Sequence, residues 1–211
     1  MKKHLWVLCL LVFLPGCLSQ THYDELMGMS DDVKAVKEND KKQDQRIDRM
    51  EEVLHQLQSG LRPEIQDSGV KVEPVKTSRV ETEAIEAVKV TMPQSVLFAS
   101  GSTRINAAGR SVLARIAEGL KSAPEEGLIR IVGHSDARPV SGKLRSHFTD
   151  NWELSAARAA AVARVFIWGE SINENRIRVE GRAAVEPVAD DTVATGRAQN
   201  RRIEIFVEKN S

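Results

Sequence analysis

Apolar residues recur at alternating intervals of three and four between Leu26 and Leu61, and no proline interrupts this stretch. A period of seven residues places these side chains along one side of a helix, which is the pattern of a coiled coil. The positions in the period are Leu26, Met29, Val33, Val36, Asp40, Gln43, Ile47, Met50, Leu54, Leu57 and Leu61. Asp40 and Gln43 are polar, and polar seam positions usually set register and oligomer state. The sequence therefore predicts a coiled coil over residues 26–61 that joins copies of the chain. The alternative is one amphipathic helix folded back on the C-terminal domain.

The N-terminus has the pattern of an export signal. A short basic start precedes an apolar run over residues 5–14, which is shorter than the roughly 20 apolar residues that cross a bilayer. Cys17 follows shortly after this run and resembles the lipobox cysteine of bacterial lipoproteins. We therefore expect a lipoprotein signal peptide over residues 1–16 and a lipidated N-terminus over residues 17–25, with acyl chains on Cys17. The alternative is an ordinary signal peptide that happens to contain a cysteine.

The rest of the chain divides into a linker and a folded domain. Residues 62–83 contain Pro63 and Pro74 with mixed charges and no lasting period, so we expect a linker there. Residues 84–208 alternate segments with strand and helix patterns, in the order β-α-β-α-β-β. This order predicts an α/β sandwich with helices on one face of a mixed sheet. The two helices are expected to begin at the capping residues Asn106 and Asp150.

Four motifs occur in order within this C-terminal segment. They are Gly-His-Ser-Asp at 133–136, Asn-Trp-Glu-Leu-Ser-Ala-Ala-Arg at 151–158, Gly-Arg at 181–182 and Gly-Arg-Ala-Gln-Asn-Arg-Arg at 196–202. Together they resemble the OmpA-like family of peptidoglycan-binding domains, which includes the C-terminal domain of OmpA, Pal and the flagellar stator subunit MotB. The resemblance spans residues 84–208 and implies that this domain binds the bacterial cell wall.

The resemblance also implies the residues that bind the wall. Asp136 and Arg158 match the pair that grips diaminopimelate in the peptidoglycan stem peptide, while Asn151, Arg201 and Gly101 match positions around the same groove. The free end of diaminopimelate carries an ammonium and a carboxylate on one carbon, so its receptor needs an acid and an arginine. The planar guanidinium meets a carboxylate with two hydrogen bonds. The alternative is a structural ion pair on the surface.

Other chemistries find little support in the sequence. The chain has 30 Lys plus Arg against 30 Asp plus Glu and only 4% aromatic residues, which argues against a nucleic-acid partner. His134, Ser135 and Asp136 are adjacent and cannot align as a catalytic triad, and the histidines show no metal-ligand spacing. We therefore expect no enzyme, no metal and no cofactor. Three large aromatic residues are interpreted as core or groove-wall residues of the second helix: Trp152, Phe166 and Trp168.

These features predict a non-enzymatic outer-membrane lipoprotein that tethers the membrane, or an envelope complex, to peptidoglycan. Leu18 follows the lipidated cysteine in place of the aspartate that commonly retains lipoproteins at the inner membrane. This favours the outer membrane, with the protein facing the periplasm. The alternative is an assembly or regulatory subunit of a motility or secretion machine that the OmpA-like domain anchors to the wall.

Overall fold

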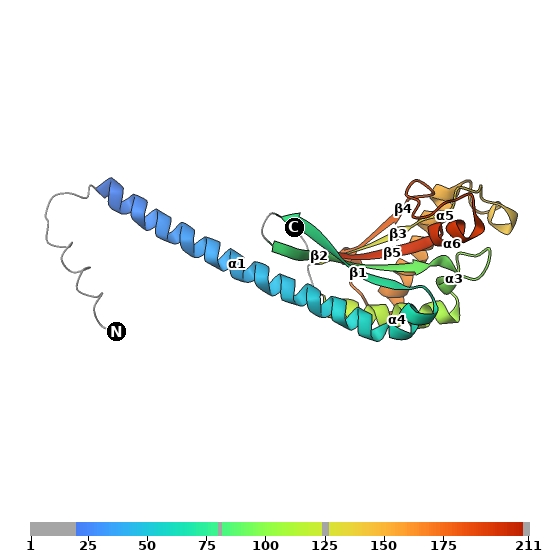
Figure 1. Cartoon of the computed structure of the whole chain (residues 1–211), viewed down its shortest axis with the longest axis horizontal. Coiled ribbons are helices and arrows are strands. Elements are labelled where there is room, and N and C mark those ends of the chain that lie inside the picture. The colour runs from blue at the N-terminus through green and yellow to red at the C-terminus, as the bar shows by residue number, and fades with distance from the viewer. Residues whose placement is uncertain (1–19, 80–81, 124–126, 209–211) are drawn as a thin grey trace. The chain divides into compact units, whose positions relative to one another are not determined.

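The structure, a computed structural model, describes residues 20–79, 82–123 and 127–208 of the 211-residue chain (Figure 1). The chain divides into two compact units, Met1–Gln45 and Arg46–Ser211. The predicted signal peptide and Cys17 lie outside the described residues, so their processing stays a prediction. Within the described ranges, no helix combines the length and the apolar character needed to cross a membrane.

One helix, α1 (Gln20–Gly60), contains nearly all of the segment with the seven-residue period and extends across the boundary between the two units. The predicted helix is therefore confirmed. In the N-terminal unit, the seam residues Val33 and Val36 leave 52% and 60% of their surface exposed. Self-association through this part of the helix stays a prediction.

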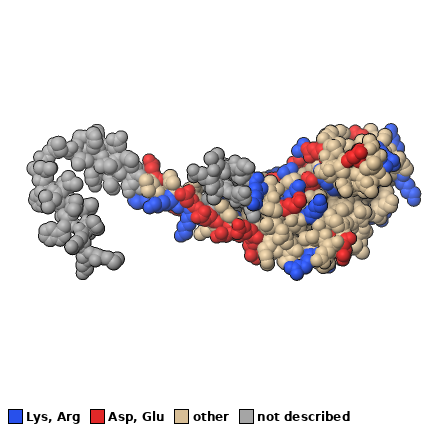
Figure 2. All heavy atoms as spheres, in the orientation of Figure 1, with Lys and Arg blue, Asp and Glu red and all other residues tan. Residues whose placement is uncertain are grey.

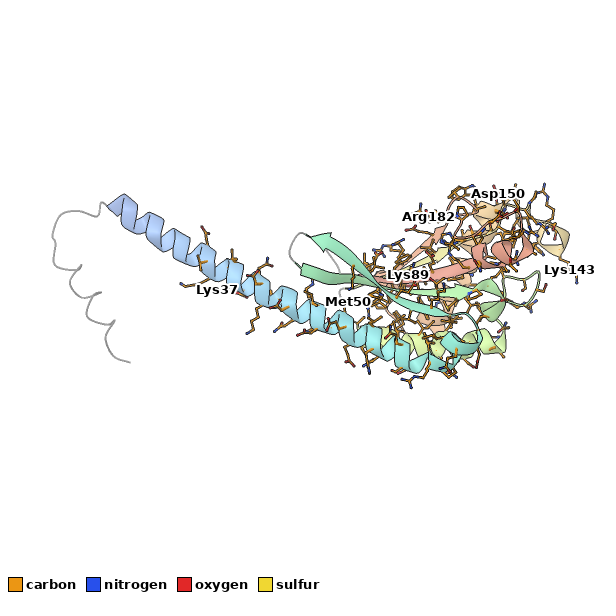
Figure 3. The ribbon with its side chains drawn as sticks, in the orientation of Figure 1. Lys37, Met50, Lys89, Lys143, Asp150 and Arg182 are labelled. Atoms are coloured by element: carbon orange, nitrogen blue, oxygen red, sulfur yellow. The ribbon has the colours of Figure 1, made fainter. Side chains whose placement is uncertain are left out.

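In the C-terminal unit, an apolar stripe of α1 is part of the domain core. Met50, which is labelled in Figure 3, is buried there together with Val53, Leu57 and Leu61, which directly follows α1, and each of the four is at most 1% exposed. Leu57 lies so close to helix α4 (Ala107–Lys121) that a Cβ atom on Gly119 would be 2.7 Å from its Cδ2. For this part of α1, the structure therefore agrees with the alternative prediction, in which the helix packs on the C-terminal domain of the same chain. A period of seven residues requires an apolar partner surface but does not specify whether another copy or the same chain supplies it.

Five strands form one mixed sheet in the order β1-β2-β5-β3-β4 (Figure 1). β3 and β4 are parallel, while the other neighbouring strands are antiparallel. The predicted α/β fold with a mixed sheet is thereby confirmed. The strands are β1 (Lys71–Arg79), β2 (Thr82–Pro93), β3 (Leu128–Gly133), β4 (Ile177–Gly181) and β5 (Arg202–Glu208).

The longer helices of the domain pack on the apolar face of this sheet, and two of them begin where the sequence predicts. Asn106 Oδ1 accepts a hydrogen bond from Gly109 N (2.6 Å) at the start of α4, and Asp150 Oδ1 accepts one from Trp152 N (2.9 Å) at the start of α5. Such caps satisfy backbone donors that the first turn of a helix leaves unpaired. The helices that follow α1 are α2 (Arg62–Asp67), α3 (Gln94–Leu97), α4 (Ala107–Lys121), η1 (Gly142–Leu144), α5 (Asn151–Arg164), η2 (Val165–Gly169), η3 (Glu174–Arg176) and α6 (Ala194–Asn200).

The linker expected over residues 62–83 is wrong for most of its length, because the segment contains α2 and β1. β1 pairs antiparallel with β2, with Lys71 opposite Thr91. Since β1 is an edge strand, Pro74 is tolerated there although it cannot donate a backbone hydrogen bond. Proline and mixed charge interrupt the alternation of apolar and polar residues that is typical of a strand. Pairing with β2 stabilises the extended conformation of this segment instead. The domain therefore begins well before residue 84.

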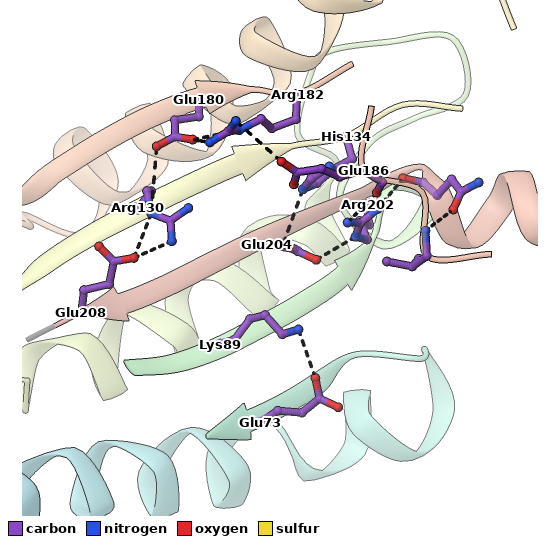
Figure 4. A network of polar contacts seen from close by, with 12 residues as sticks. Glu73, Lys89, Arg130, His134, Glu180, Arg182, Glu186, Arg202, Glu204 and Glu208 are labelled. Atoms are coloured by element: carbon purple, nitrogen blue, oxygen red, sulfur yellow. Dashed lines mark hydrogen bonds and ion pairs between the residues drawn. The ribbon is translucent and has the colours of Figure 1, made fainter. Parts of the chain in front are cut away.

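Side chains of a β-strand alternate between the two faces of the sheet, so the residues between the buried ones point to the opposite face. Many of these residues are charged. Arg130 donates to Glu208 Oε1 through Nε (2.8 Å) and Nη2 (2.5 Å), and its guanidinium lies 4.1 Å from the centre of the Phe206 ring. Lys89 of β2 pairs with Glu73 of β1 at 3.5 Å (Figure 4). Acidic and basic side chains also intermingle over the face of the domain that Figure 2 shows, so this face has no broad patch of one charge.

Candidate functional site

The loop that follows β3 carries Asp136 and is fixed by backbone hydrogen bonds. His134 N donates to Arg202 O (2.9 Å), and Ser135 N donates to Ala183 O (2.7 Å). These bonds join the loop to the start of β5 and to the loop after β4. Asp136 therefore has a defined position at the carboxyl end of β3.

Two glycines let α5 lie close to the parallel strands β3 and β4. A Cβ atom on Gly133 would overlap Ser155 O, and one on Gly181 would lie 2.7 Å from Ala156 N. Because any other residue would add that Cβ atom, only glycine permits this approach. Arg158 follows less than one turn after Ser155 on the same helix, so this backbone contact sets its distance from the end of β3.

Asp136 pairs with Arg201, although the sequence had singled out Arg158 as its companion in the site. Arg201 Nη1 lies 2.5 Å from Asp136 Oδ2, and Arg138 N donates to Asp136 Oδ1 (3.2 Å). The Asp136 residue is 8% exposed, whereas the side chain of Arg201 is 37% exposed. The ion pair therefore links a nearly buried carboxylate to a guanidinium that solvent reaches.

Arg158 is only 4% exposed and is held by neutral groups. Its Nη1 donates to Gln94 Oε1 (2.6 Å), and its Nη2 donates to Ser102 O (3.5 Å). The guanidinium also lies over the Phe98 ring, 5.7 Å from its centre, while the buried Nε has no hydrogen-bond partner among the described residues. Hydrogen bonds and a ring face orient this side chain, and they leave its positive charge uncompensated by a direct ion pair with any described residue.

Burial and neighbouring charges shift the pKa of Arg158. Burial, and then the positive charge of Arg201, lower the pKa of Arg158 to about 10, while Asp136 acts in the opposite direction. Arg158 thus remains protonated at neutral pH. A buried cation without a paired anion is costly, so the site is suited to an anionic group brought by a ligand.

The two remaining candidates, Asn151 and Gly101, have different roles. Asn151 Nδ2 donates to Asp136 O (3.1 Å) and to Arg138 O (2.9 Å), so it fixes the backbone that carries the carboxylate. Gly101 has φ +62°, a conformation that glycine adopts without strain. It precedes Ser102, whose carbonyl oxygen contacts Arg158. The structure therefore brings Asp136, Arg158, Asn151 and Arg201 together and places Gly101 in an adjoining loop.

Sequence reasoning missed Gln94, Phe98 and Ser102, which surround the Arg158 guanidinium. They belong to α3 and the loop after it, which a bridge between Phe98 and Ile105 closes. Gln94 N also donates to Arg201 O (2.9 Å), so this residue contacts both arginines of the site. A helix of four residues is too short to show a period, and the resemblance pointed only to Gly101 in this segment.

A buried polar network lies beside the site (Figure 4). His134 Nε2 lies 3.4 Å from Glu204 Oε2, and Arg202 Nε donates to Glu204 Oε1 (2.8 Å). Burial by itself raises the pKa of Glu204, but the nearby His134 ring and the hydrogen bond from Arg202 outweigh it and lower this pKa to about 2. Arg202 Nη2 also donates to Glu186 O (3.1 Å). The network fixes the start of β5, which directly follows Arg201.

The large aromatic residues of the second helix occupy different environments. Phe166 is fully buried in the core, as predicted. Trp152 is 50% exposed and lines a surface pocket, which agrees with a groove-wall position. Trp168 is 76% exposed, so a core position is wrong for it. It lies in η2, a single π-helical turn that continues α5.

The site contains two groups that can bind a charged ligand. The Arg158 guanidinium can pair with an anion, and the Asp136 carboxylate forms an ion pair with Arg201. Ser135 is 5% exposed, and its hydroxyl donates to Asp136 O (2.9 Å), so it is not paired with a general base. Within the described residues, no group of three His, Cys, Asp or Glu side chains is arranged to hold a metal ion. The arrangement suits binding of a ligand that carries both charges.

Comparison with known proteins identifies the family of the domain. The OmpA family model matches residues 97–201. The "Probable lipoprotein YiaD" of Escherichia coli is 31% identical over 145 residues, which are 69% of this chain and 58% of that protein. The chain matches between about half and two thirds of the length of the first curated relatives.

Two solved structures have the same fold over most of the domain. The cell wall anchor of the type VI secretion system (T6SS) from Pseudomonas aeruginosa has 34% identity and a TM-score of 0.61, covering 73% of this chain and 97% of that one. A putative MotB-like protein from Desulfovibrio vulgaris has 26% identity and a TM-score of 0.64, covering 80% and 96%. The motifs, the mixed sheet and the match over residues 97–201 together place this chain in the OmpA family.

Proposed function

We propose that this protein is a non-enzymatic tether that binds peptidoglycan through the diaminopimelate end of the stem peptide. One observation carries the proposal: Arg158 is 4% exposed, is hydrogen-bonded to the neutral Gln94 and has no ion-pair partner among the described residues. Asp136, the acid of the site, pairs with Arg201 instead. The buried guanidinium is therefore available to pair with an anion that a ligand brings.

The ligand supplies both groups that the site can bind. Its distal carboxylate pairs with Arg158, whose planar fork donates two parallel hydrogen bonds. Its ammonium group pairs with Asp136, which lies close enough to influence the ionisation of Arg158. Arg201, whose side chain is 37% exposed, has room to move as the ammonium approaches. Lysine-type peptidoglycan lacks the distal carboxylate and would leave Arg158 unpaired.

The test is co-sedimentation of the protein with purified sacculi of the diaminopimelate and lysine types. Removing one member of a desolvated charge pair typically costs about 2–5 kcal/mol, so Arg158→Ala and Asp136→Ala should each weaken binding about thirtyfold or more. Arg178→Ala is the matched control, because Arg178 is an exposed arginine of β4 outside the site. Equal pelleting of wild type and site variants, or equal binding to both wall types, would exclude this site. Release of muropeptides would instead indicate an enzyme.

The membrane end of the tether rests on the sequence and on the named relatives. Cys17 would carry the acyl chains, and several chains bind a membrane durably where one chain holds only marginally. The relative YiaD is named a probable lipoprotein. Leu18 after the cysteine supports the outer membrane, with the domain in the periplasm. Loss of palmitate labelling in Cys17→Ser tests the anchor, and retained labelling would exclude it.

A second candidate function is that of a subunit that a motility or secretion machine uses to hold on to the wall. The similarity to a T6SS cell wall anchor and to a putative MotB-like protein favours it. The exposed seam residues Val33 and Val36 of α1 then provide the surface for self-association or for a partner protein. Affinity purification from crosslinked cells separates the two functions, because a simple tether brings down only wall fragments and its own copies.

A further inference from the structure

Gln94 contacts both Arg158 and Arg201 of the candidate site. Its side-chain Oε1 accepts a hydrogen bond from Arg158 Nη1 (2.6 Å), and its backbone N–H donates to Arg201 O (2.9 Å). The backbone contact continues the pairing of β2 with β5, in which Pro93 lies opposite Arg202. The sheet therefore fixes the position of Gln94 relative to both arginines.

The single turn of α3 connects Gln94 to the aromatic ring beside Arg158. Phe98 N donates to Gln94 O (2.9 Å), and the centre of the Phe98 ring lies 5.7 Å from the Arg158 guanidinium. Residues four positions apart lie on the same side of a helical turn, so the amide and the ring reach the guanidinium together. Two uncharged groups from one short segment thus orient Arg158.

The direction of the Gln94 amide follows from the chemistry of Arg158. A guanidinium has only N–H donors and no acceptor, so it can pair with the oxygen of the amide but not with its nitrogen. A glutamate side chain would have almost the same size and would offer an anionic oxygen to the same donor. The neutral side chain therefore orients the guanidinium without neutralising its charge.

We propose that Gln94 sets the preference of the site for an anionic ligand group, because its neutral amide orients Arg158 and leaves the charge of Arg158 to the ligand. The inference rests on the proposed function, in which the distal carboxylate of diaminopimelate pairs with Arg158. Arg158 is only 4% exposed, so the few side chains around it decide whether the chain or the ligand supplies its counter-ion. Gln94 is thus a positioning residue, which acts on the ligand through Arg158.

Gln94→Glu tests the charge of this side chain at nearly constant size. The new carboxylate should pair with Arg158, and this charge-assisted hydrogen bond should raise the melting temperature of the full chain by about 2–4 °C. The same ion pair competes with the carboxylate of the ligand, so binding of diaminopimelate-type stem peptide should weaken about tenfold. Lysine-type stem peptide lacks that carboxylate and should be affected less, so the affinity ratio between the two peptides should fall. A purely structural role of Gln94 would not produce opposite changes in stability and affinity.

Gln94→Met and Gln66→Glu are the matched controls. Methionine has a similar length but removes the strong acceptor, so Gln94→Met should lower both the melting temperature and the affinity for diaminopimelate-type peptide. Gln66 is exposed in α2, which contributes no residue to the site, so Gln66→Glu should leave the affinity unchanged. Calorimetric titration with sugar-free stem peptides measures the affinities, and circular dichroism measures the melting temperatures.

The outcomes separate this inference from the proposed function. Weaker binding by Gln94→Glu at equal or higher stability, with a smaller preference for the diaminopimelate type, supports the inference. If the wild type binds diaminopimelate-type peptide and Gln94→Glu binds it equally well, or loses stability together with affinity, the inference is overturned while the proposed function stands. If the wild type does not bind this peptide, both fail.

Discussion

The burial of Leu57 predicts that the C-terminal part of α1 is an integral part of the domain. Leu57 is 1% exposed and lies in the core against Gly119, so Leu57→Ala would remove three buried carbon atoms and leave a cavity. Such changes cost about 2–5 kcal/mol. For a domain of this size each kcal/mol lowers the melting temperature by about 2–4 °C, so a loss near 3 kcal/mol corresponds to roughly 6–12 °C.

The same reasoning predicts a larger effect when the whole segment is removed. Each fully buried large apolar side chain contributes about 1.5–3 kcal/mol, so the four core residues of α1 and its C-terminal end together contribute about 6–12 kcal/mol. This is comparable with the entire stability of a typical domain, about 5–15 kcal/mol. A fragment of residues 84–208, which also lacks β1, should therefore be unfolded or barely stable, whereas residues 46–208 should fold.

The assay is thermal and urea unfolding of residues 46–208, followed by circular dichroism, for wild type and Leu57→Ala. Glu51→Ala in the same fragment is the control within the same helix, because Glu51 is exposed and lies outside the apolar stripe, and we expect a change below about 0.5 kcal/mol. If residues 84–208 were as stable as residues 46–208, or if Leu57→Ala had no effect, the packing of α1 on this domain would be refuted.

Two further predictions concern the helix seam and the buried network. Asp40→Leu with Gln43→Leu should raise the melting temperature of an α1-mediated oligomer, because two polar seam positions become apolar; sedimentation equilibrium and circular dichroism measure this, and a monomer at high micromolar concentration would contradict it. The pKa of Glu204 falls from 4.5 to about 2 on folding, so its charged form stabilises the domain above pH 4.5 and this contribution is lost as the pH falls towards 2. Glu204→Gln should flatten that part of the stability profile in acid unfolding experiments, and an unchanged slope would show that the network does not act in this way.

The sequence predicted elements that depend on local patterns and missed those that depend on distant partners. The caps Asn106 and Asp150 mark the starts of α4 and α5, because capping uses residues only two or three positions away. β1 was not predicted, because its extended conformation depends on pairing with β2. Arg158 was found through its motif, but its partner Gln94 lies 64 positions away and no local pattern joins them.

The prediction for Asp136 shows a related limit. Motifs identified both Asp136 and Arg158, yet they could not say that Arg201 would be the ion-pair partner of the carboxylate. That choice depends on how the loop after β3 meets the start of β5, which backbone hydrogen bonds between the two segments determine. Similarly, the seven-residue period identified α1 as a helix but did not reveal that Met50 and Leu57 are used within the domain.

The contacts of Gly133 and Gly181 with α5 have a consequence for how freely the sequence of this domain can vary. Because the backbone of α5 touches both strands, the spacing between the end of β3 and Arg158 does not depend on the size of intervening side chains. Neighbouring positions can accept substitutions without moving the arginine, while a methyl group at either glycine would push the helix outward. In a saturation mutagenesis screen for wall binding, these two positions should be as intolerant as the binding residues themselves, although neither contacts the ligand through a side chain.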